Sequence, residues 1–211
     1  MATRIWRLGR WLGLVLAVAT WAAPAMAQTA TVLRVQGEAV ALAQAGSRPL
    51  AVGDPVRAGE RLKTGPAARL ELRFADGMDV ILGAEAELLL AEFVWDATGQ
   101  RGQAALEVAA GAFLVESGAV GKLPGHPLTV KTPLASVGVR GTRFWGGPLE
   151  APLNVLLLDG RVVVTTAQGS VELVDPGAGT AVTAPGEAPT APAFWGDERI
   201  GHAIATVSFG P

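Results

Sequence analysis

The sequence predicts an all-β protein. Glycine and proline are frequent, at 27 and 14 of 211 residues, and the segments between them are short and rich in Val and Leu. In residues 70–75 apolar and polar side chains alternate, which places Leu70, Leu72 and Phe74 on one face of a strand. Asp76-Gly77 follows at once and is typical of a tight hairpin turn with left-handed dihedral angles. Short strands joined by tight turns are therefore expected.

The other expected elements follow from the same signals. Residues 78–82 return as the partner strand, and an earlier hairpin is expected in residues 32–42 around Gln36-Gly37. Residues 103–112 fit either a short alanine-rich helix or a strand. Asp159-Gly160 predicts a second hairpin between residues 156–158 and 161–165, and Gln168-Gly169 predicts a turn into residues 171–174.

Two unbroken apolar runs, residues 156–158 and 162–164, indicate strands covered on both faces. Residues 176–192 are rich in Gly, Ala, Thr and Pro and are typical of a linker or a loosely ordered edge. Beyond them, the alternation in residues 204–209 predicts one last strand.

The first 27 residues have the pattern of a secretory signal peptide. Arg4, Arg7 and Arg10 precede an apolar run at residues 11–23, and Ala25-Met26-Ala27 offers a cleavage site with small residues. The run is shorter than the ~20 residues that a spanning helix needs, although an uncleaved anchor is the alternative. We expect cleavage near Ala27 and a periplasmic or secreted mature chain without a membrane span.

Composition excludes several kinds of site. The chain has no cysteine, so it forms no disulfide, thiolate zinc site or cysteine nucleophile. Removing three of the 17 basic residues with the signal peptide leaves 19 acidic residues in clear excess, which argues against nucleic-acid binding. Because His126 and His202 are isolated, no metal site is expected, and Ser136 lacks the first glycine of a nucleophile elbow. No catalytic group and no cofactor site is therefore predicted.

The most informative segment is residues 132–144, in the pattern T-P-x-A-x-x-G-V-R-G-T-x-F. Its fixed positions are Thr132, Pro133, Ala135, Gly138, Val139, Arg140, Gly141, Thr142 and Phe144. The segment resembles the hallmark of the FecR domain, and residues 59–65 and 70–77 are similar to earlier motifs of that family. The resemblance spans about residues 59–179. It implies a twisted two-layer or β-solenoid-like arrangement of short, mainly antiparallel strands in a domain of residues 28–179, followed by a tail of residues 180–211.

Arg140 admits two interpretations. Pro133 fixes an extended backbone, and Gly138 and Gly141 leave room on either side of Val139-Arg140. A buried Arg140 would act as a clasp, hydrogen-bonded to turn carbonyls and to Asp76 or Asp159, because a desolvated guanidinium must be fully paired. The alternative is that Arg140 belongs to a recognition surface.

Three tryptophans are candidate surface contacts. Trp145 is expected to be half exposed at a strand edge, and Trp95 and Trp195 have similar surroundings in the sequence. Each is expected more often as a lid on the core than as a platform for a ligand. If two of them shared one exposed face, contact with a protein or a glycan would be favoured.

The resemblance implies a non-enzymatic binding or signalling module. FecR domains meet the signalling domain of an outer-membrane receptor and pass its state to a sigma factor, but the transmembrane and cytoplasmic regions of that relay are not expected here. We expect an envelope protein as partner, such as an outer-membrane receptor or its signalling domain, bound by strand addition at a sheet edge. The alternative is a secreted structural or adhesive domain that binds glycans or surface polymers.

Overall fold

The computed structural model describes residues 29–98, 100–125 and 127–210, and it confirms the predicted all-β class. The predicted signal peptide and His126 lie outside these residues. The strands are β1 (Ala30–Gln36), β2 (Ala39–Ala43), β3 (Gly46–Pro49), β4 (Pro55–Val56), β5 (Arg61–Thr64), β6 (Arg69–Phe74), β7 (Asp79–Leu82), β8 (Glu87–Asp96), β9 (Arg101–Ala110), β10 (Phe113–Glu116), β11 (Leu128–Lys131), β12 (Ser136–Gly147), β13 (Leu153–Thr166), β14 (Gly169–Leu173), β15 (Ala178–Val182) and β16 (Ala193–Phe194). The helices are the 3₁₀ turn η1 (Val120–Lys122) and α1 (Asp197–Ala205).

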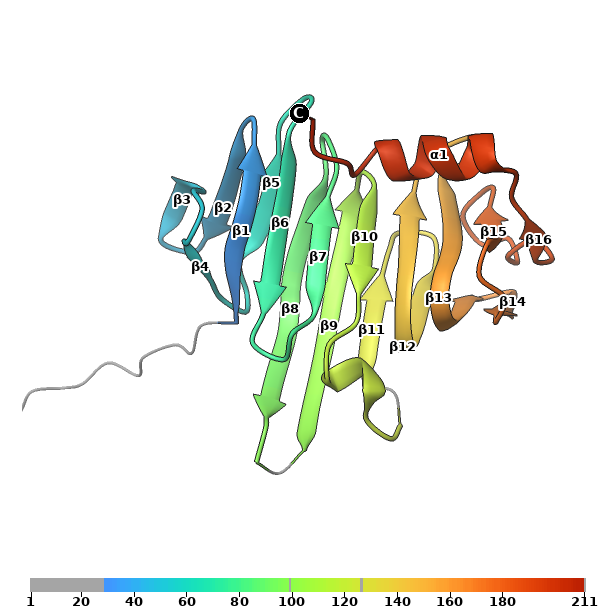
Figure 1. Cartoon of the computed structure of the whole chain (residues 1–211), viewed down its shortest axis with the longest axis horizontal. Coiled ribbons are helices and arrows are strands. Elements are labelled where there is room, and N and C mark those ends of the chain that lie inside the picture. The colour runs from blue at the N-terminus through green and yellow to red at the C-terminus, as the bar shows by residue number, and fades with distance from the viewer. Residues whose placement is uncertain (1–28, 99, 126, 211) are drawn as a thin grey trace, which may run out of the picture.

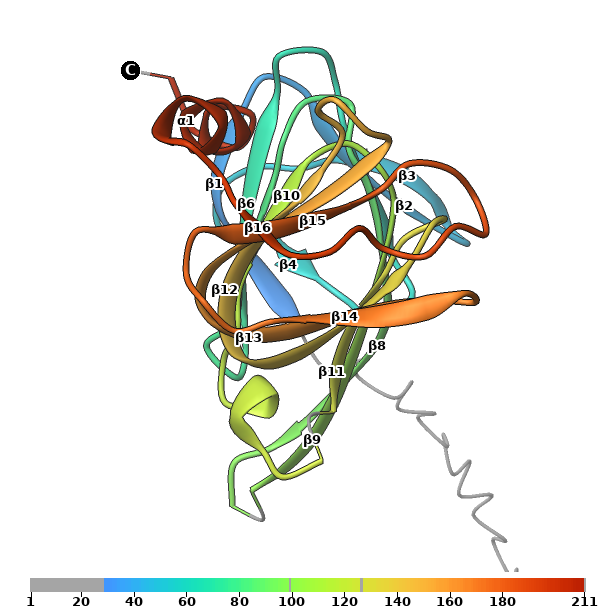
Figure 2. The same cartoon turned by 90° about the vertical axis from the view of Figure 1, so that its right-hand side faces the viewer.

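All strands belong to one sheet that curls round on itself (Figure 2). The strand order runs β3-β2-β5-β8-β9-β11-β12-β10-β7-β6-β1-β4, and β13 to β16 extend it from β12. Every pairing is antiparallel except that of β9 with β11, as the prediction of mainly antiparallel strands requires. Because β3 and β4 are the two ends of the order and do not pair, the curled sheet stays open at a seam between them.

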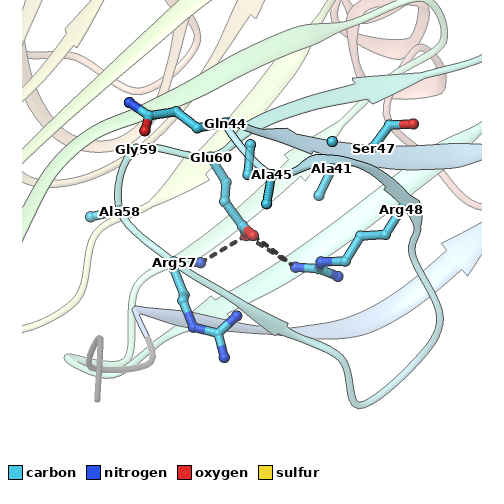
Figure 3. A pocket seen from close by; sticks show the side chains of 11 residues that line it. Ala41, Gln44, Ala45, Ser47, Arg48, Arg57, Ala58, Gly59 and Glu60 are labelled. Carbon is cyan, nitrogen blue, oxygen red and sulfur yellow. Dashed lines mark hydrogen bonds and ion pairs between the residues drawn. The ribbon is translucent and has the colours of Figure 1, made fainter. Parts of the chain in front are cut away.

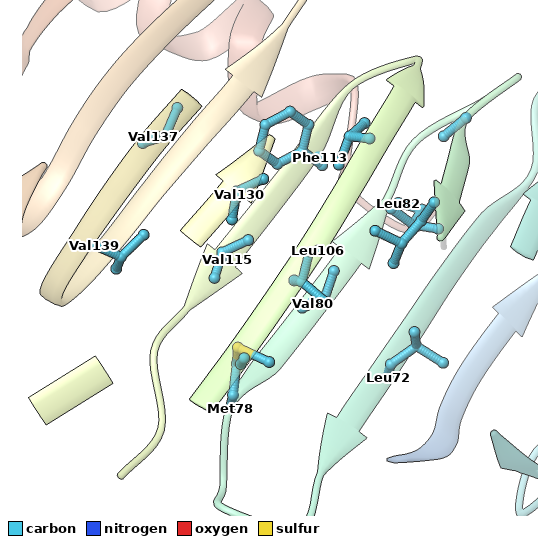
Figure 4. Packing of buried hydrophobic residues seen from close by; sticks show 14 of the residues in the cluster. Leu72, Met78, Val80, Leu82, Leu106, Phe113, Val115, Val130, Val137 and Val139 are labelled. Atoms are coloured by element: carbon cyan, nitrogen blue, oxygen red, sulfur yellow. The ribbon is translucent and has the colours of Figure 1, made fainter. Parts of the chain in front are cut away.

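The curl produces two layers around one core. In Figure 1 the front layer holds β1, β6, β7 and β10, and β5, β8, β9 and β11 lie behind it. The predicted alternation in β6 is confirmed, since Leu70, Leu72 and Phe74 are buried. They meet inward-facing residues of both layers, among them Val80 and Leu106 (Figure 4). Residues 103–112, for which helix and strand were both considered, lie mostly in β9.

Two of the predicted hairpins form, with details that the sequence did not supply. β6 pairs with β7 across Asp76-Gly77, but only Gly77 is left-handed, at φ +84°. The Phe74 N–H donates to the Met78 carbonyl at 2.8 Å, so the loop between these two residues has three residues, with glycine in its last position. β13 and β14 form the hairpin expected at Gln168-Gly169.

The other two predicted hairpins are wrong. β1 pairs with β4 and β6, whereas β2 pairs with β3 and β5. Gln36-Gly37 therefore connects β1 to β2, but these two strands do not pair with each other. Asp159-Gly160 lies inside the continuous strand β13, at an irregularity in its register with β12. The left-handed Gly160 produces a bend there instead of a reversal.

Of the two unbroken apolar runs, one is covered on both faces. Leu156 and Leu157 are fully buried, because the core lies on one side of β13 and α1 on the other. In residues 162–164 the middle side chain, Val163, is half-exposed, so this run has one buried face only.

The predicted last strand in residues 204–209 is also wrong. α1 ends at Ala205, and no strand follows within the part of the chain that the structure describes. The apolar residues Ile200, Ala203, Ile204 and Val207 recur at helical spacing and form a second cluster with Leu114, Trp145 and Leu156 on the outer face of the front layer. No helix among the described residues is long and apolar enough to cross a membrane.

Candidate interaction site at the strand bend

The motif begins with a turn that is closed by Thr132. The Thr132 N–H donates to the Ala135 carbonyl at 2.8 Å, and the Thr132 hydroxyl oxygen accepts from the N–H of Ala135 at 3.0 Å. Pro133 is exposed and Ala135 is buried. The turn leads from β11 into β12 and sets their antiparallel pairing.

β12 then bends from the back layer into the front layer. Its first half pairs with β11 and the end of β13, and its second half pairs with β10 and the start of β13. Gly141 and Gly160, at φ +57° and +80°, lie on the two strands at the bend. A Cβ on Gly160 would lie 2.1 Å from the Gly141 carbonyl oxygen, so the approach of the strands requires glycine there.

The buried group that holds the bend is the hydroxyl of Thr142. It donates to the Arg161 carbonyl at 2.6 Å and accepts from the N–H groups of Arg161 and Arg140, both at 3.2 Å. The Thr142 N–H donates to the hydroxyl of Ser117 at 2.7 Å. One side chain thus satisfies backbone groups on both strands where the regular ladder is interrupted.

The interpretation of Arg140 as a buried clasp is wrong. Its side chain is exposed, and it makes no hydrogen bond or ion pair with the described residues. Val137 and Val139 point into the core, so alternation along β12 directs Arg140 outward. That alternation is visible in the sequence and is the signal that identifies the exposed face.

Asp76 does more than form its turn. Its carboxylate is buried and accepts from the N–H groups of Met78 and Val120, both at 3.0 Å. The Asp76 carbonyl accepts from the Ala119 N–H at 2.9 Å. A Cβ on Gly118 would lie 2.4 Å from the Met78 nitrogen, which explains the glycine. These contacts hold η1 against the β6–β7 turn and so position Lys122.

A polar, partly cationic surface surrounds the bend. Lys122, Arg140 and Gly141 line a shallow hollow of about 510 Å³ together with Leu123 and Pro124. Arg161 lies opposite Arg140 across β12 and β13, and its guanidinium donates to Glu172 on β14 at 2.9 Å. We name the outward face of β12, β13 and β14 from residue 136 to 140, 161 to 165 and 169 to 173 the bend surface.

β14 forms a free edge of the bend surface. It pairs with β13 only. The two-residue turn Ala167-Gln168 joins the first pair, Thr166 and Gly169, so Ser170 and Glu172 direct their backbone groups away from β13. β14 contains no proline or lysine, residues that commonly protect such edges. β3, at one end of the sheet, contains Pro49, which has no N–H to offer.

The tryptophans do not form an exposed platform. Trp145 is fully buried, and its indole N–H donates to the Thr206 hydroxyl at 2.9 Å. Trp195 is 7% exposed and packs edge-on against Trp145, with the Arg199 guanidinium 3.8 Å from its ring centroid. Trp95 is half-buried against the core. The expected half exposure of Trp145 is wrong, because α1 covers it.

No group of three or more metal-ligating His, Cys, Asp or Glu side chains occurs among the described residues. Asp159 is exposed and lies opposite Arg143, so it is not the predicted partner of a buried Arg140. Phe144, the last residue of the motif, packs edge-on against Phe113 in the core, with ring centroids 6.0 Å apart.

The family described as FecR protein matches residues 60–172, which is more than half of the chain. The chain belongs to the FecR family. The match contains the bend, the β6–β7 turn and most of β14, and it ends before β15, β16 and α1. The residues of the bend surface are thus part of the FecR domain, whereas the covering helix lies beyond the matched region.

Two crystal structures of a protein from Parabacteroides distasonis, described as a candidate anti-sigma factor, share the fold. Each is 18% identical and has a TM-score of 0.54; both alignments cover 68% of this chain. The chain spans 64% and 63% of the length of those two structures. No curated protein matches the sequence.

Proposed function

We propose that this FecR protein is a non-enzymatic regulatory module of the cell envelope that binds a protein partner through the bend surface. Membership of the FecR family and a fold shared with a protein described as a candidate anti-sigma factor support a regulatory role. The signal-peptide pattern of the first 27 residues supports a periplasmic or secreted location. An outer-membrane receptor, or its signalling domain, is the partner that the family favours.

The observation that carries the proposal is the free edge of β14, on the same surface as Arg140 and two strands away from it. A partner segment in extended conformation can continue the sheet by hydrogen bonds to the backbone of Ser170 and Glu172. Arg140 and Lys122 then supply cationic contacts for acidic side chains of the partner. Two of the three tryptophans whose exposure would favour glycan binding, Trp145 and Trp195, are buried, which supports the protein partner.

Site-specific crosslinking tests the proposal. A photoreactive amino acid at Ser170 is expected to capture one envelope protein in cells, and the same group at Val52, an exposed position distant in sequence, is expected not to capture it. The affinity of the captured protein is then measured for purified variants. Ser170→Pro removes an outward N–H without removing a ladder hydrogen bond, so we expect binding to weaken about tenfold or more.

Ser47→Pro is the matched control, because it makes the same change in β3 at the already protected edge. Arg140→Ala is expected to weaken binding and to leave the other properties of the protein unchanged. Equal affinity of wild type and Ser170→Pro would contradict strand addition at β14.

A further inference from the structure

A hollow of about 730 Å³ lies between the β2–β3 hairpin and residues 57–60 (Figure 3). It stands at the open seam of the sheet, where β3 and β4 do not pair. All but one of its lining residues precede the matched FecR region, so family membership does not account for it. Ligand sites of roughly 300–1,000 Å³ occur in the mouths of β-barrels, which makes both the size and the place suitable for a small molecule.

The floor of the hollow is apolar and open, because alanine and glycine residues line it. These residues are Ala41, Ala43, Ala45, Gly46, Ala58 and Gly59. Ala41 belongs to the hydrophobic core, whereas Ala43 is exposed. The hollow therefore continues the apolar inner face of β2 outward, with no side chain large enough to fill it.

One wall presents a guanidinium in a fixed position. Arg48 Nη2 donates to the Pro55 carbonyl at 2.7 Å and to the two carboxylate oxygens of Glu60 at 3.0 and 3.2 Å. Glu60 is buried and also accepts the N–H of Arg57 at 3.0 Å. Arg48 Nη1 has only Asp54 near it, at 3.9 Å, which is longer than a hydrogen bond. Donors of Arg48 thus remain for a ligand.

A second cation stands at the rim. The guanidinium of Arg57 makes no hydrogen bond or ion pair with the described residues. Glu60 and Asp54 both lie near Arg48, whereas no carboxylate of the described residues pairs with Arg57, so the Arg57 guanidinium is the cation that an anionic ligand would neutralise.

We propose that this hollow binds a small amphipathic carboxylate. Its apolar body lies on the alanine floor, and its carboxylate accepts from Arg48 and Arg57. Because Arg48 is already oriented by Glu60 and Pro55, little side-chain ordering accompanies binding. This inference is independent of the proposed partner at β14.

Titration with octanoate and with its neutral amide, octanamide, tests the proposal, with backbone amide shifts as the readout. Octanoate is expected to perturb residues 41–48 and 57–60 and to bind about tenfold more tightly than octanamide, as one charge-assisted hydrogen bond allows. Arg57→Gln is expected to remove most of that preference. Arg101→Gln, which changes an exposed arginine outside both proposed sites, is expected to leave it unchanged.

Ala43→Phe fills the hollow from an exposed position and is expected to abolish binding of both compounds. Perturbations elsewhere, equal affinity for acid and amide, or binding that persists in Ala43→Phe would each overturn the proposal. Absence of octanoate binding to the wild-type protein would overturn it as well.

Discussion

Within the motif, Thr142 and Arg140 have opposite environments although they are two residues apart. The hydroxyl of Thr142 is buried and contacts three backbone groups, whereas the guanidinium of Arg140 is exposed. The polar side chain that stabilises the bend is therefore the small one. The charged one is the exposed one, and we propose that it contacts the partner.

Thr142→Val keeps the shape of the side chain and removes the hydroxyl. We expect a loss of about 1–3 kcal/mol in the free energy of unfolding, because backbone N–H groups of the bend are left without an acceptor. Arg140→Ala is expected to cost less than about 0.5 kcal/mol, as exposed substitutions usually do. Denaturant unfolding measures both, and Thr165→Val on the exposed face of β13 is the control. A larger loss of unfolding free energy for Arg140→Ala than for Thr142→Val would instead support the interpretation of Arg140 as a buried clasp.

Glu87 gives a prediction about pH. Hydrogen bonding to Lys63 at 2.8 Å, and to Arg61 at 2.6 Å, holds the pKa of Glu87 below its ordinary value despite some desolvation. Since the folded pKa lies below that of the unfolded chain, about 4.3, the stability that this carboxylate contributes is present above that value. It is lost as the pH falls through the folded pKa.

Glu87→Gln is therefore expected to cost about 0.5–1 kcal/mol at pH 7, a modest value because its partners are partly exposed. The difference from wild type should shrink below about pH 4, and unfolding measured from pH 3 to 7 would show this. Glu38→Gln, at an exposed position, is the control. A difference that stays constant down to pH 3 would contradict the assignment.

At the scale of elements, two glycines have different requirements: Gly77 lies in the β6–β7 turn, and Gly160 lies at the bend of β12 and β13. Gly77 and Gly160 share a left-handed backbone, but a Cβ on Gly77 meets no atom within 4 Å, whereas one on Gly160 meets the Gly141 carbonyl. Gly77→Ala thus measures the conformational cost alone, about 1 kcal/mol. Gly160→Ala adds a backbone clash, and we expect a loss of at least about 3 kcal/mol or a failure to fold.

Thermal unfolding of Gly77→Ala and Gly160→Ala checks this difference. If Gly160→Ala keeps the stability of Gly77→Ala, the two strands do not approach as closely as described. Because the bend joins the two layers, its loss is expected to affect the whole domain and not β14 alone.

At the scale of the whole molecule, the two outer faces differ. α1 covers the front layer over Trp145, Leu114 and Leu156, and the bend surface carries no such cover. The helix and the core form separate apolar clusters. Among the described residues, α1 covers one outer face of the sheet, and the surface that we propose for a partner is the face without a helix.

A chain that ends at Pro192 lacks β16, Trp195 and α1 and is expected to keep β1 to β15, because the main core is intact. The free energy of unfolding should fall by at least about 3 kcal/mol, the usual cost of deleting one buried aromatic side chain. Trp145 should become exposed, with a red shift of its fluorescence. A chain that unfolds completely would show that the two clusters depend on each other.

The sequence predicted the features that local patterns determine. The alternation of Leu70, Leu72 and Phe74 identified a strand and its buried face, and Gln168-Gly169 identified a hairpin. Asp159-Gly160 has the same local signature as Asp76-Gly77 but lies in a continuous strand. A left-handed glycine occurs both in tight turns and in bulges. Which of the two forms depends on the strand that lies opposite, and the local sequence does not contain that information.

The candidate site, too, was predictable where local patterns determine it and not where distant segments of the chain meet. Motif matching identified the residues of the bend, but the burial of Trp145 depends on α1, which lies far along the chain. The helix itself was available to sequence reasoning through the spacing of Ile200, Ala203, Ile204 and Val207. A short alternation in residues 204–209 concealed it, since a window of six residues fits both periods.

The position of α1 has a consequence for synthesis. Ribosomes make the front layer well before residues 195–207, so Trp145 and its neighbours stay uncovered until those residues have emerged. The N–H of Gly210 even reaches the side chain of Gln36 on the first strand, at 2.9 Å. A nascent chain that does not yet contain residues 195–207 therefore exposes an apolar face, the kind of surface through which folding intermediates aggregate.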